Sequence, residues 1–235
     1  MSIADLRRDY SLGALRRSDL ELDPIAQFKK WFEQASGARG GGRLRKFFVG
    51  LYKSLLMAAG AEPPDVTAMT LATADKMGRP SARVVLLKGV DERGFIFFTN
   101  YDSRKGQELT ENPQAALVFY WADLERQVCI AGEVRKLPAA ESEAYFKTRP
   151  VGSRLAAWAS RQSGIVRDRA ELEEKWNQIK AGFAGKEVTC PPYWGGYVLA
   201  PQRIEFWQGG ANRLHDRFRY SRQIDNKWLI ERLSP

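Results

Sequence analysis

The stretch VTAMTLATADKMGRPSARVVLLKGVDERGFIFFTN, residues 66–100, decides the expected fold. It contains three short runs rich in β-branched and aromatic residues, separated by the turn signals KMGRP and DERG. Similar runs follow at 114–121 and 126–137, and others lie between 195 and 233. Many short strands with few helices between them predict a mainly β protein with peripheral α-helices, built as an antiparallel barrel.

Helices are expected on both sides of these strands. In DPIAQFKKWFEQAS, residues 23–36, Asp23 can cap a helix and Pro24 suits its first turn. Three further helices are predicted: a short one that starts at Ser103 and ends before Pro113, and two near 138–148 and 168–184.

The chain is expected to form an N-terminal arm, residues 1–22, and one domain, residues 23–235. The arm is highly charged, so we expect it to have little packing of its own. The domain contains an amphipathic segment at 37–62, in which residues 43–59 place apolar side chains at helical spacing and basic ones mainly elsewhere. We expect this helix to cover apolar protein surface; a membrane surface is the alternative.

Composition limits the function classes. The formal net charge is +9, which attracts anions such as nucleic acid, an anionic membrane or phosphorylated small molecules. Two cysteines, Cys129 and Cys190, and a single histidine predict neither a disulfide framework nor a metal site. The chain shows no apolar signal region and no run long enough to span a bilayer, so we expect a soluble cytoplasmic protein with reduced thiols.

The single histidine lies in QGGANRLHDR, residues 208–217. Arg213, His215 and Arg217 alternate, so a strand would place all three on one face, where they would attract an anion. The alternative is a solvated charged strand in which Asp216 pairs with a neighbour.

Arg83 and Lys88 lie on either side of an apolar run. Their odd spacing predicts opposite faces of a straight strand, so they bind different groups or the strand bends between them. Downstream, Arg104 and Lys105 fall in the first turn of the helix that Ser103 caps. Cations there oppose the helix dipole, which an anion held at the same helix start would explain. The alternative is a lysine-rich surface loop.

A further phosphate-binding pattern lies in AYFKTRPVGSR, residues 144–154. Tyr145 and Arg149 share a helical face, and Ser153 follows shortly afterwards. A phenol, a guanidinium and a hydroxyl at this spacing can hold a phosphate. The chain contains neither a Gly-x-Gly-x-x-Gly sequence nor a P-loop, so these nucleotide-binding motifs do not explain the cations.

Together these stretches resemble the pyridoxine (pyridoxamine) 5'-phosphate oxidase family. IEFWQGGANRLHDR is similar to its signature, and ARVVLLKG, FFTNYDSRKG, FYW, ERQV, YFKTRP and ASRQS resemble its motifs in the same order. The resemblance covers about residues 3–36 and 64–235, whereas 37–62 replace what is usually a short connection.

The resemblance implies an FMN-binding split β-barrel that works as a homodimer with FMN between subunits and a dimerisation and active-site region at 190–235. It implies oxidation of pyridoxine 5'-phosphate or pyridoxamine 5'-phosphate to pyridoxal 5'-phosphate, with O2 reoxidising the flavin and giving H2O2. These ligands are phosphorylated, which agrees with the basic charge.

The resemblance also implies roles for matching positions. Arg213 and His215 would lie over the substrate ring as catalytic residues, and Arg7 and Tyr10 would close over the site. Lys88, Tyr145, Arg149 and Ser153 would bind the substrate phosphate, and Arg104 with Lys105 the flavin phosphate. The full set of FMN-contacting positions is Arg83, Val84, Val85, Leu86, Lys88, Phe98, Thr99, Arg104, Lys105, Gln127, Gln162, Ser163, Trp207 and Arg217.

Three other functions are alternatives to the one that the resemblance implies. One is a split-barrel flavin oxidase with another substrate, as in phenazine biosynthesis, which the intact phosphate and RLH residues disfavour. The second is a non-catalytic binder of flavin or pyridoxal phosphate. The third, a nucleic-acid-binding protein explained by charge alone, lacks a recognition motif.

Overall fold

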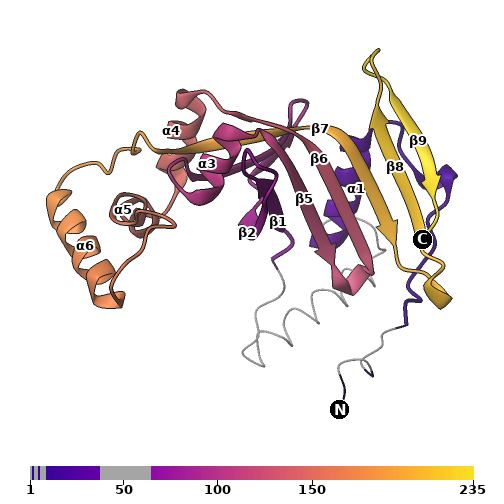
Figure 1. The fold of residues 1–235 in the computed structure, drawn as a ribbon, viewed down its shortest axis with the longest axis horizontal. Helices are drawn as coiled ribbons and strands as arrows, with labels where there is room; N and C mark the ends of the chain where they lie inside the picture. Colours follow the sequence, from indigo (N-terminus) through magenta and orange to yellow (C-terminus); the bar gives the residue numbers. More distant parts are fainter. Residues whose placement is uncertain (1, 3–4, 6–8, 38–64) are drawn as a thin grey trace. The chain divides into compact units, whose positions relative to one another are not determined.

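The computed structural model describes residues 2, 5, 9–37 and 65–235 (Figure 1). Arg7 and most of the 37–62 segment, including the predicted 43–59 helix, lie outside the described residues. The chain divides into two compact units. The first unit comprises the described residues of Met1–Thr70, Leu117–Ala131 and Pro201–Pro235, and the second comprises Leu71–Ala116 and Gly132–Ala200.

Within the described residues, nine strands form one sheet in the order β2-β1-β5-β6-β7-β4-β3, with β8 paired to β7 and to β9. The pairs β3–β4, β4–β7, β7–β8 and β8–β9 are antiparallel. The strands are β1 (Ala68–Ala74), β2 (Pro80–Leu86), β3 (Gly89–Asp91), β4 (Gly94–Asn100), β5 (Gln114–Trp121), β6 (Arg126–Lys136), β7 (Trp194–Gln208), β8 (Asp216–Arg222) and β9 (Trp228–Leu233). This content confirms the predicted mainly β class with peripheral helices.

The first unit contains helix α1 (Pro24–Ser36), which begins as predicted. The Asp23 carboxylate accepts hydrogen bonds from the first backbone N–H groups, and Pro24 occupies the first turn. Phe28 and Trp31 are buried. Phe28 packs against Phe119 on β5, with ring centroids 5.0 Å apart, and Trp31 against Phe206 on β7, at 5.2 Å.

The N-terminal arm does pack against the first unit, so our expectation for residues 1–22 is wrong over residues 11–21. Leu15 is only 4% exposed, and its N–H donates to the Asp216 carboxylate at 2.9 Å. The N–H groups of Ser11 and Leu12 donate to Glu125 at 2.8 and 2.9 Å. The acceptors come from distant parts of the chain, so local charge density could not reveal this packing.

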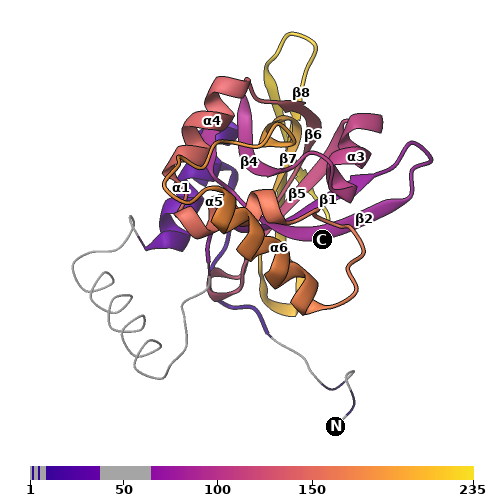
Figure 2. The same ribbon diagram turned by 90° about the vertical axis from the view of Figure 1, so that its left-hand side faces the viewer.

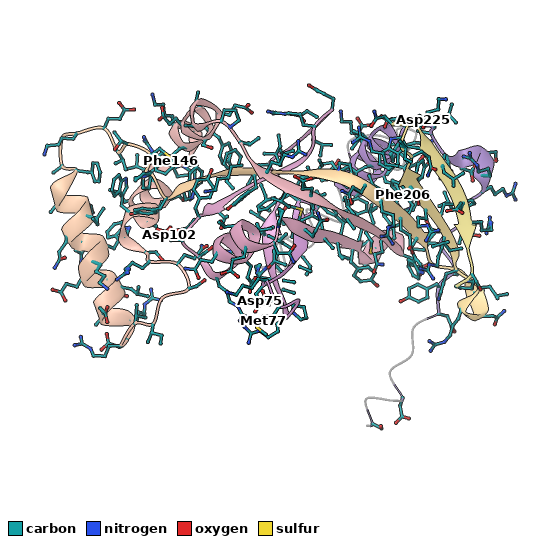
Figure 3. The ribbon with its side chains drawn as sticks, turned by 45° about the horizontal axis from the view of Figure 1, so that its top comes forward. Asp75, Met77, Asp102, Phe146, Phe206 and Asp225 are labelled. Carbon is teal, nitrogen blue, oxygen red and sulfur yellow. The ribbon has the colours of Figure 1, made fainter. Side chains whose placement is uncertain are left out.

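The second unit contains four helices: α3 (Arg104–Glu111), α4 (Ala139–Thr148), α5 (Val151–Ala159) and α6 (Arg169–Gly182). Three of them were predicted, whereas α5 was not. Helices α5 and α6 lie side by side (Figure 2). Phe146 on α4, labelled in Figure 3, forms a buried cluster with Leu155 on α5 and Trp194 on β7. None of the described helices has the length and apolar composition that crossing a membrane requires.

Candidate functional site

One group of predicted cofactor residues lies around the first turn of α3, in the second unit. Ser103 caps the helix by accepting the Gly106 N–H, as expected. The ammonium of Lys105 donates to Thr99 Oγ1 at 3.1 Å, to Ser103 Oγ at 3.2 Å and to Gln162 Oε1 at 2.6 Å. The structure therefore brings together predicted cofactor residues that are far apart in the sequence.

Lys105 is a buried cation whose hydrogen-bond acceptors are neutral oxygens. Burial lowers its pKa to about 8, and the Arg83 charge acts in the same direction, whereas the Glu108 carboxylate acts against them. A buried ammonium is stabilised by a neighbouring anion, because neutral oxygens compensate only part of the lost hydration. The chemistry of this cluster therefore suits a phosphate.

Arg83 and Arg104 lie on two sides of the buried carboxylate of Glu108. Arg83 on β2 reaches Glu108 Oε2 at 3.4 Å, and Arg104 Nε donates to Glu108 Oε1 at 2.9 Å. Burial would raise the pKa of Glu108, but hydrogen bonds from Ser81, Thr73 and Arg104 bring it down to about 2. Sequence reasoning missed Glu108, although its position four residues after Arg104 on one helix was a usable signal.

A hollow of about 1010 Å³ opens beside this cluster, lined by the loop before α3, by residues 159–166 and by part of α6. Arg104, Gln162 and Ser163 line it, together with Asp102, which is labelled in Figure 3. The Arg104 N–H donates to Ser163 Oγ at 3.2 Å, and Ser163 has a positive φ of 70°. This turn presents two predicted cofactor residues to the hollow.

Strand β2 ends at Leu86, so Lys88 lies beyond it and not on the same strand as Arg83. The opposite-face argument for Arg83 and Lys88 is therefore wrong, since the strand ends between them. Val84 and Leu86 are 68% and 39% exposed. Their exposure is compatible with the predicted cofactor contacts.

The predicted substrate-phosphate residues gather at the junction of α4 and α5. The Tyr145 ring stacks on Phe98 with centroids 4.0 Å apart, and the Arg149 guanidinium lies 4.7 Å from the Trp194 ring centroid. Arg149 Nη1 is buried and finds no acceptor among the described residues. Ser153 lies in the first turn of α5, where backbone N–H groups lack intrahelical acceptors. Such donors suit a phosphate.

Two aromatic side chains pack against the single histidine in the first unit. The His215 ring centroid lies 4.7 Å from Trp207 and 5.5 Å from Tyr10. A Cβ at Gly209 would come within 2.7 Å of the Tyr10 ring, so only glycine fits against it. The structure therefore brings together three predicted site residues, Tyr10, Trp207 and His215. A second hollow of about 470 Å³ is lined by His215 and residues 232–235.

The alternating strand predicted for Arg213, His215 and Arg217 is wrong. Arg213 ends a 3-10 turn, Ala211–Arg213, with a positive φ of 62°, and β8 starts only at Asp216. Asp216 pairs with Arg232 and accepts the Leu15 N–H.

Two more predicted cofactor residues already have partners in the first unit. Arg217 donates to both carboxylate oxygens of Glu205, at 2.8 and 3.1 Å, and to the Ser234 carbonyl at 2.9 Å. Gln127 Nε2 donates to the Cys129 sulfur at 3.2 Å.

Sequence comparison relates these motifs to known proteins. A family model described as pyridoxamine 5'-phosphate oxidase matches residues 58–181, and one for the pyridoxine 5'-phosphate oxidase C-terminal dimerisation region matches 194–235. The chain belongs to the pyridoxamine 5'-phosphate oxidase family. The protein named pyridoxine/pyridoxamine 5'-phosphate oxidase in Paraburkholderia phymatum is 51% identical over 234 residues, which cover 100% of this chain and 99% of the relative. The protein of that name in Trichormus variabilis is 49% identical with the same coverage.

Solved structures support the same family and fold. PhzG from Burkholderia lata 383, in complex with tetrahydrophenazine-1-carboxylic acid, is 31% identical with a TM-score of 0.77, covering 96% of this chain and all of that one. A pyridoxamine 5'-phosphate oxidase-related, FMN-binding protein from Nostoc punctiforme is 16% identical with a TM-score of 0.59, covering 84% of this chain and all of that one. These findings confirm the predicted family, its split-barrel fold and its oxidoreductase class.

Proposed function

We propose that this oxidase converts pyridoxine 5'-phosphate and pyridoxamine 5'-phosphate to pyridoxal 5'-phosphate, with FMN as cofactor and O2 as acceptor, giving H2O2. With pyridoxamine 5'-phosphate, water supplies the aldehyde oxygen and the amine leaves as ammonia. The observation that carries the proposal is the presence of two groups of phosphate-binding donors in the second unit. One is centred on Lys105 and the other on Arg149. FMN has one phosphate and so does each substrate, which matches two clusters.

The Lys105 cluster fits the FMN phosphate. Lys105 is buried among neutral oxygens, and the guanidinium groups of Arg83 and Arg104 belong to the same cluster. With Thr99, Gln162 and Ser163, these residues would hold the phosphate by charge-assisted hydrogen bonds. The absence of a dinucleotide-binding motif in the sequence favours FMN over FAD. When bound, the flavin supplies the hydride-accepting chemistry.

The Arg149 cluster is proposed to hold the substrate phosphate. Its buried and unpartnered Nη1 has a donor to offer, and the start of α5 adds Ser153 and free backbone N–H groups. Tyr145 and Lys88 complete the proposed set. Binding of the phosphate fixes one end of the substrate. The reacting carbon is thereby positioned even where no protein group contacts that carbon.

Arg213 and His215 are proposed to orient the substrate ring. The Gly210 N–H donates to His215 Nδ1, which leaves Nε2 to exchange a proton with the ring oxygen of the substrate. The planar guanidinium group of Arg213 fixes the angle of the substrate ring. Tyr10 packs on His215, and we propose that it closes over the bound substrate with Arg7.

The remaining roles concern assembly. The match of residues 194–235 to a dimerisation region supports a homodimer, and we propose that FMN binds at its interface. Region 190–235 then serves both dimerisation and the active site, on a domain of residues 23–235 that follows the 1–22 arm.

A direct test is to purify the protein, record its absorbance and assay both products. We expect a flavin spectrum, release of FMN on denaturation, and equal amounts of pyridoxal 5'-phosphate and H2O2. A flavin-loaded protein that oxidises neither phosphorylated substrate would overturn the proposal.

The likeness to PhzG favours one second candidate, a flavin oxidase acting on a tricyclic carboxylate such as the compound bound in that structure. The phosphate-oxidase relatives share more of the sequence, 51% against 31%. Reduction of the flavin by that compound, without reduction by pyridoxamine 5'-phosphate, would establish this second candidate.

A further inference from the structure

Glu108 on α3 is a carboxylate that no motif assigned to the site. It is only 5% exposed. Its Oε1 accepts a hydrogen bond from Arg104 Nε at 2.9 Å, and its Oε2 accepts from Thr73 Oγ1 at 2.5 Å and Ser81 Oγ at 2.6 Å. Every one of these partners lies in the second unit. A buried carboxylate with this many donors is held in one orientation.

The two hydroxyl groups connect Glu108 to Arg83. Arg83 Nη1 donates to Thr73 Oγ1 at 2.5 Å, and Arg83 Nη2 donates to Ser81 Oγ. A hydroxyl has a single proton, and here each hydroxyl gives it to Glu108, so its lone pairs face the guanidinium. The orientation of both hydroxyls therefore depends on an ionised acceptor at position 108. Arg83 is held by these hydroxyls together with the Leu71 carbonyl, which accepts from Arg83 Nη1 at 3.2 Å.

We infer that Glu108 is a positioning residue, which holds Arg83 and Arg104 at a fixed separation to bind the phosphate of the cofactor. The inference rests on the proposed function, because it takes the Lys105 cluster as the FMN-phosphate site. Glu108 itself does not touch the phosphate. It acts through the two arginines, one held directly and the other mainly through Thr73 and Ser81.

Charge and positioning predict opposite effects when Glu108 is replaced by glutamine. The substitution removes the one negative charge from a cluster of Arg83, Arg104 and Lys105, so charge alone would tighten phosphate binding. However, glutamine has only one acceptor oxygen. If that oxygen accepts from Thr73 and Ser81, the NH2 group faces the Arg104 N–H, donor against donor, and releases Arg104; if it accepts from Arg104, the NH2 group reverses the hydroxyls and releases Arg83. Positioning therefore predicts weaker binding.

The experiment compares FMN with riboflavin, which lacks the phosphate. The full-length protein, freed of flavin by dialysis, is titrated with each ligand while flavin fluorescence is followed. We expect Glu108→Gln to weaken FMN binding by about tenfold or more, since a hydrogen bond to a charged group is worth that much. Riboflavin binding should stay within about twofold of wild type, because the altered contacts reach only the phosphate.

Two further variants keep the test decisive. Glu111→Gln is the matched control, because Glu111 is an exposed carboxylate on the same helix, and it should change neither ligand. Ser81→Ala removes one connecting hydroxyl without changing any charge, so it should also weaken FMN selectively, by a smaller factor. It replaces Glu108→Gln if that variant does not fold.

The outcomes separate this inference from the proposed function. If the wild type binds no FMN, both fail. If the wild type binds FMN but Glu108→Gln binds it equally or more tightly, only the inference fails. Equal weakening of FMN and riboflavin would assign Glu108 a purely structural role and would also overturn the inference.

Discussion

The backbone N–H of Gly210 donates a 3.1 Å hydrogen bond to Nδ1 of His215. This contact makes Nδ1 the acceptor, so the neutral ring has its proton on Nε2. The ring is also packed between Trp207 and Tyr10. Both the orientation and the tautomer of the histidine are therefore set by its neighbours, which suits a group that must present one nitrogen to a substrate.

Arg213→Lys should slow flavin reduction without releasing the flavin. Lysine keeps the charge but loses the planar fork, and a displacement of the reacting carbon by about 1 Å can cost roughly a hundredfold in rate. His215→Asn keeps a hydrogen-bonding group and should lose less. Anaerobic stopped-flow reduction by pyridoxamine 5'-phosphate measures both effects.

Arg222→Lys is a suitable control for Arg213→Lys, because Arg222 is exposed at the end of β8. It should reduce its flavin at the wild-type rate. If Arg213→Lys did the same, the orienting role proposed for Arg213 would be wrong.

Arg149→Ala should raise the KM for phosphorylated substrates about ten- to a hundredfold, since a charge-assisted contact contributes about 1.5–3 kcal/mol. FMN affinity should not change, because none of the described hydrogen bonds of Lys105 involves Arg149. Steady-state kinetics and a flavin titration measure the two effects. Lys147→Ala in the last turn of α4 is the control. Arg149 follows this helix with extended backbone, so the helical face predicted for it and Tyr145 is wrong. An unchanged KM with loss of FMN would mean that the two phosphate sites are exchanged.

Lys105 predicts a pH dependence for FMN binding. Burial lowers its pKa to about 8, and only the protonated form attracts the phosphate. As the pH rises through 8, the free protein loses this proton and must regain it on binding, so the dissociation constant should increase by up to about tenfold per pH unit. Titrations between pH 7 and 9.5 measure this slope.

Riboflavin and Lys105→Arg serve as controls for the pH experiment. Riboflavin has no phosphate, and arginine stays protonated throughout this range, so both combinations should give a flat profile. A flat profile for wild-type protein with FMN would show that Lys105 does not bind the phosphate.

Elements with local sequence signals were predicted correctly, whereas contacts between segments that are distant in the sequence were not predicted. Asp23 and Ser103 cap their helices as expected, because capping uses a side chain and the next few N–H groups. Helix α5 was not predicted, although Pro150 directly precedes its first turn, a place where proline is compatible with the start of a helix.

Site residues followed the same rule. The motifs predicted Lys105 and His215 as site residues but not Glu108, whose contacts with Thr73 and Ser81 join segments that are distant in the sequence. The strand predicted through Arg213 was wrong because Asn212 and Arg213 both adopt positive φ, which asparagine favours more than most residues but arginine does not signal. The spacing of Glu108 from Arg104 was a local signal for one ion pair, whereas its link to Arg83 is recognisable only in the folded structure.

Arg217→Ala should weaken FMN binding and leave the KM of the substrate unchanged. In the structure Arg217 pairs with Glu205 through two hydrogen bonds, so this arginine is held rigidly on β8.

Arg219→Ala is a matched control for Arg217→Ala, because Arg219 lies two residues further along the same strand and also pairs with a carboxylate, Glu231. Both variants lose one ion pair and one positive charge, so any general effect on stability or on electrostatic attraction should be similar. A larger loss of FMN affinity in Arg217→Ala, measured by flavin titration alongside thermal unfolding of both variants, therefore reports a specific contact with the cofactor. Equal affinities in the two variants would remove Arg217 from the proposed cofactor site and leave it as a structural partner of Glu205.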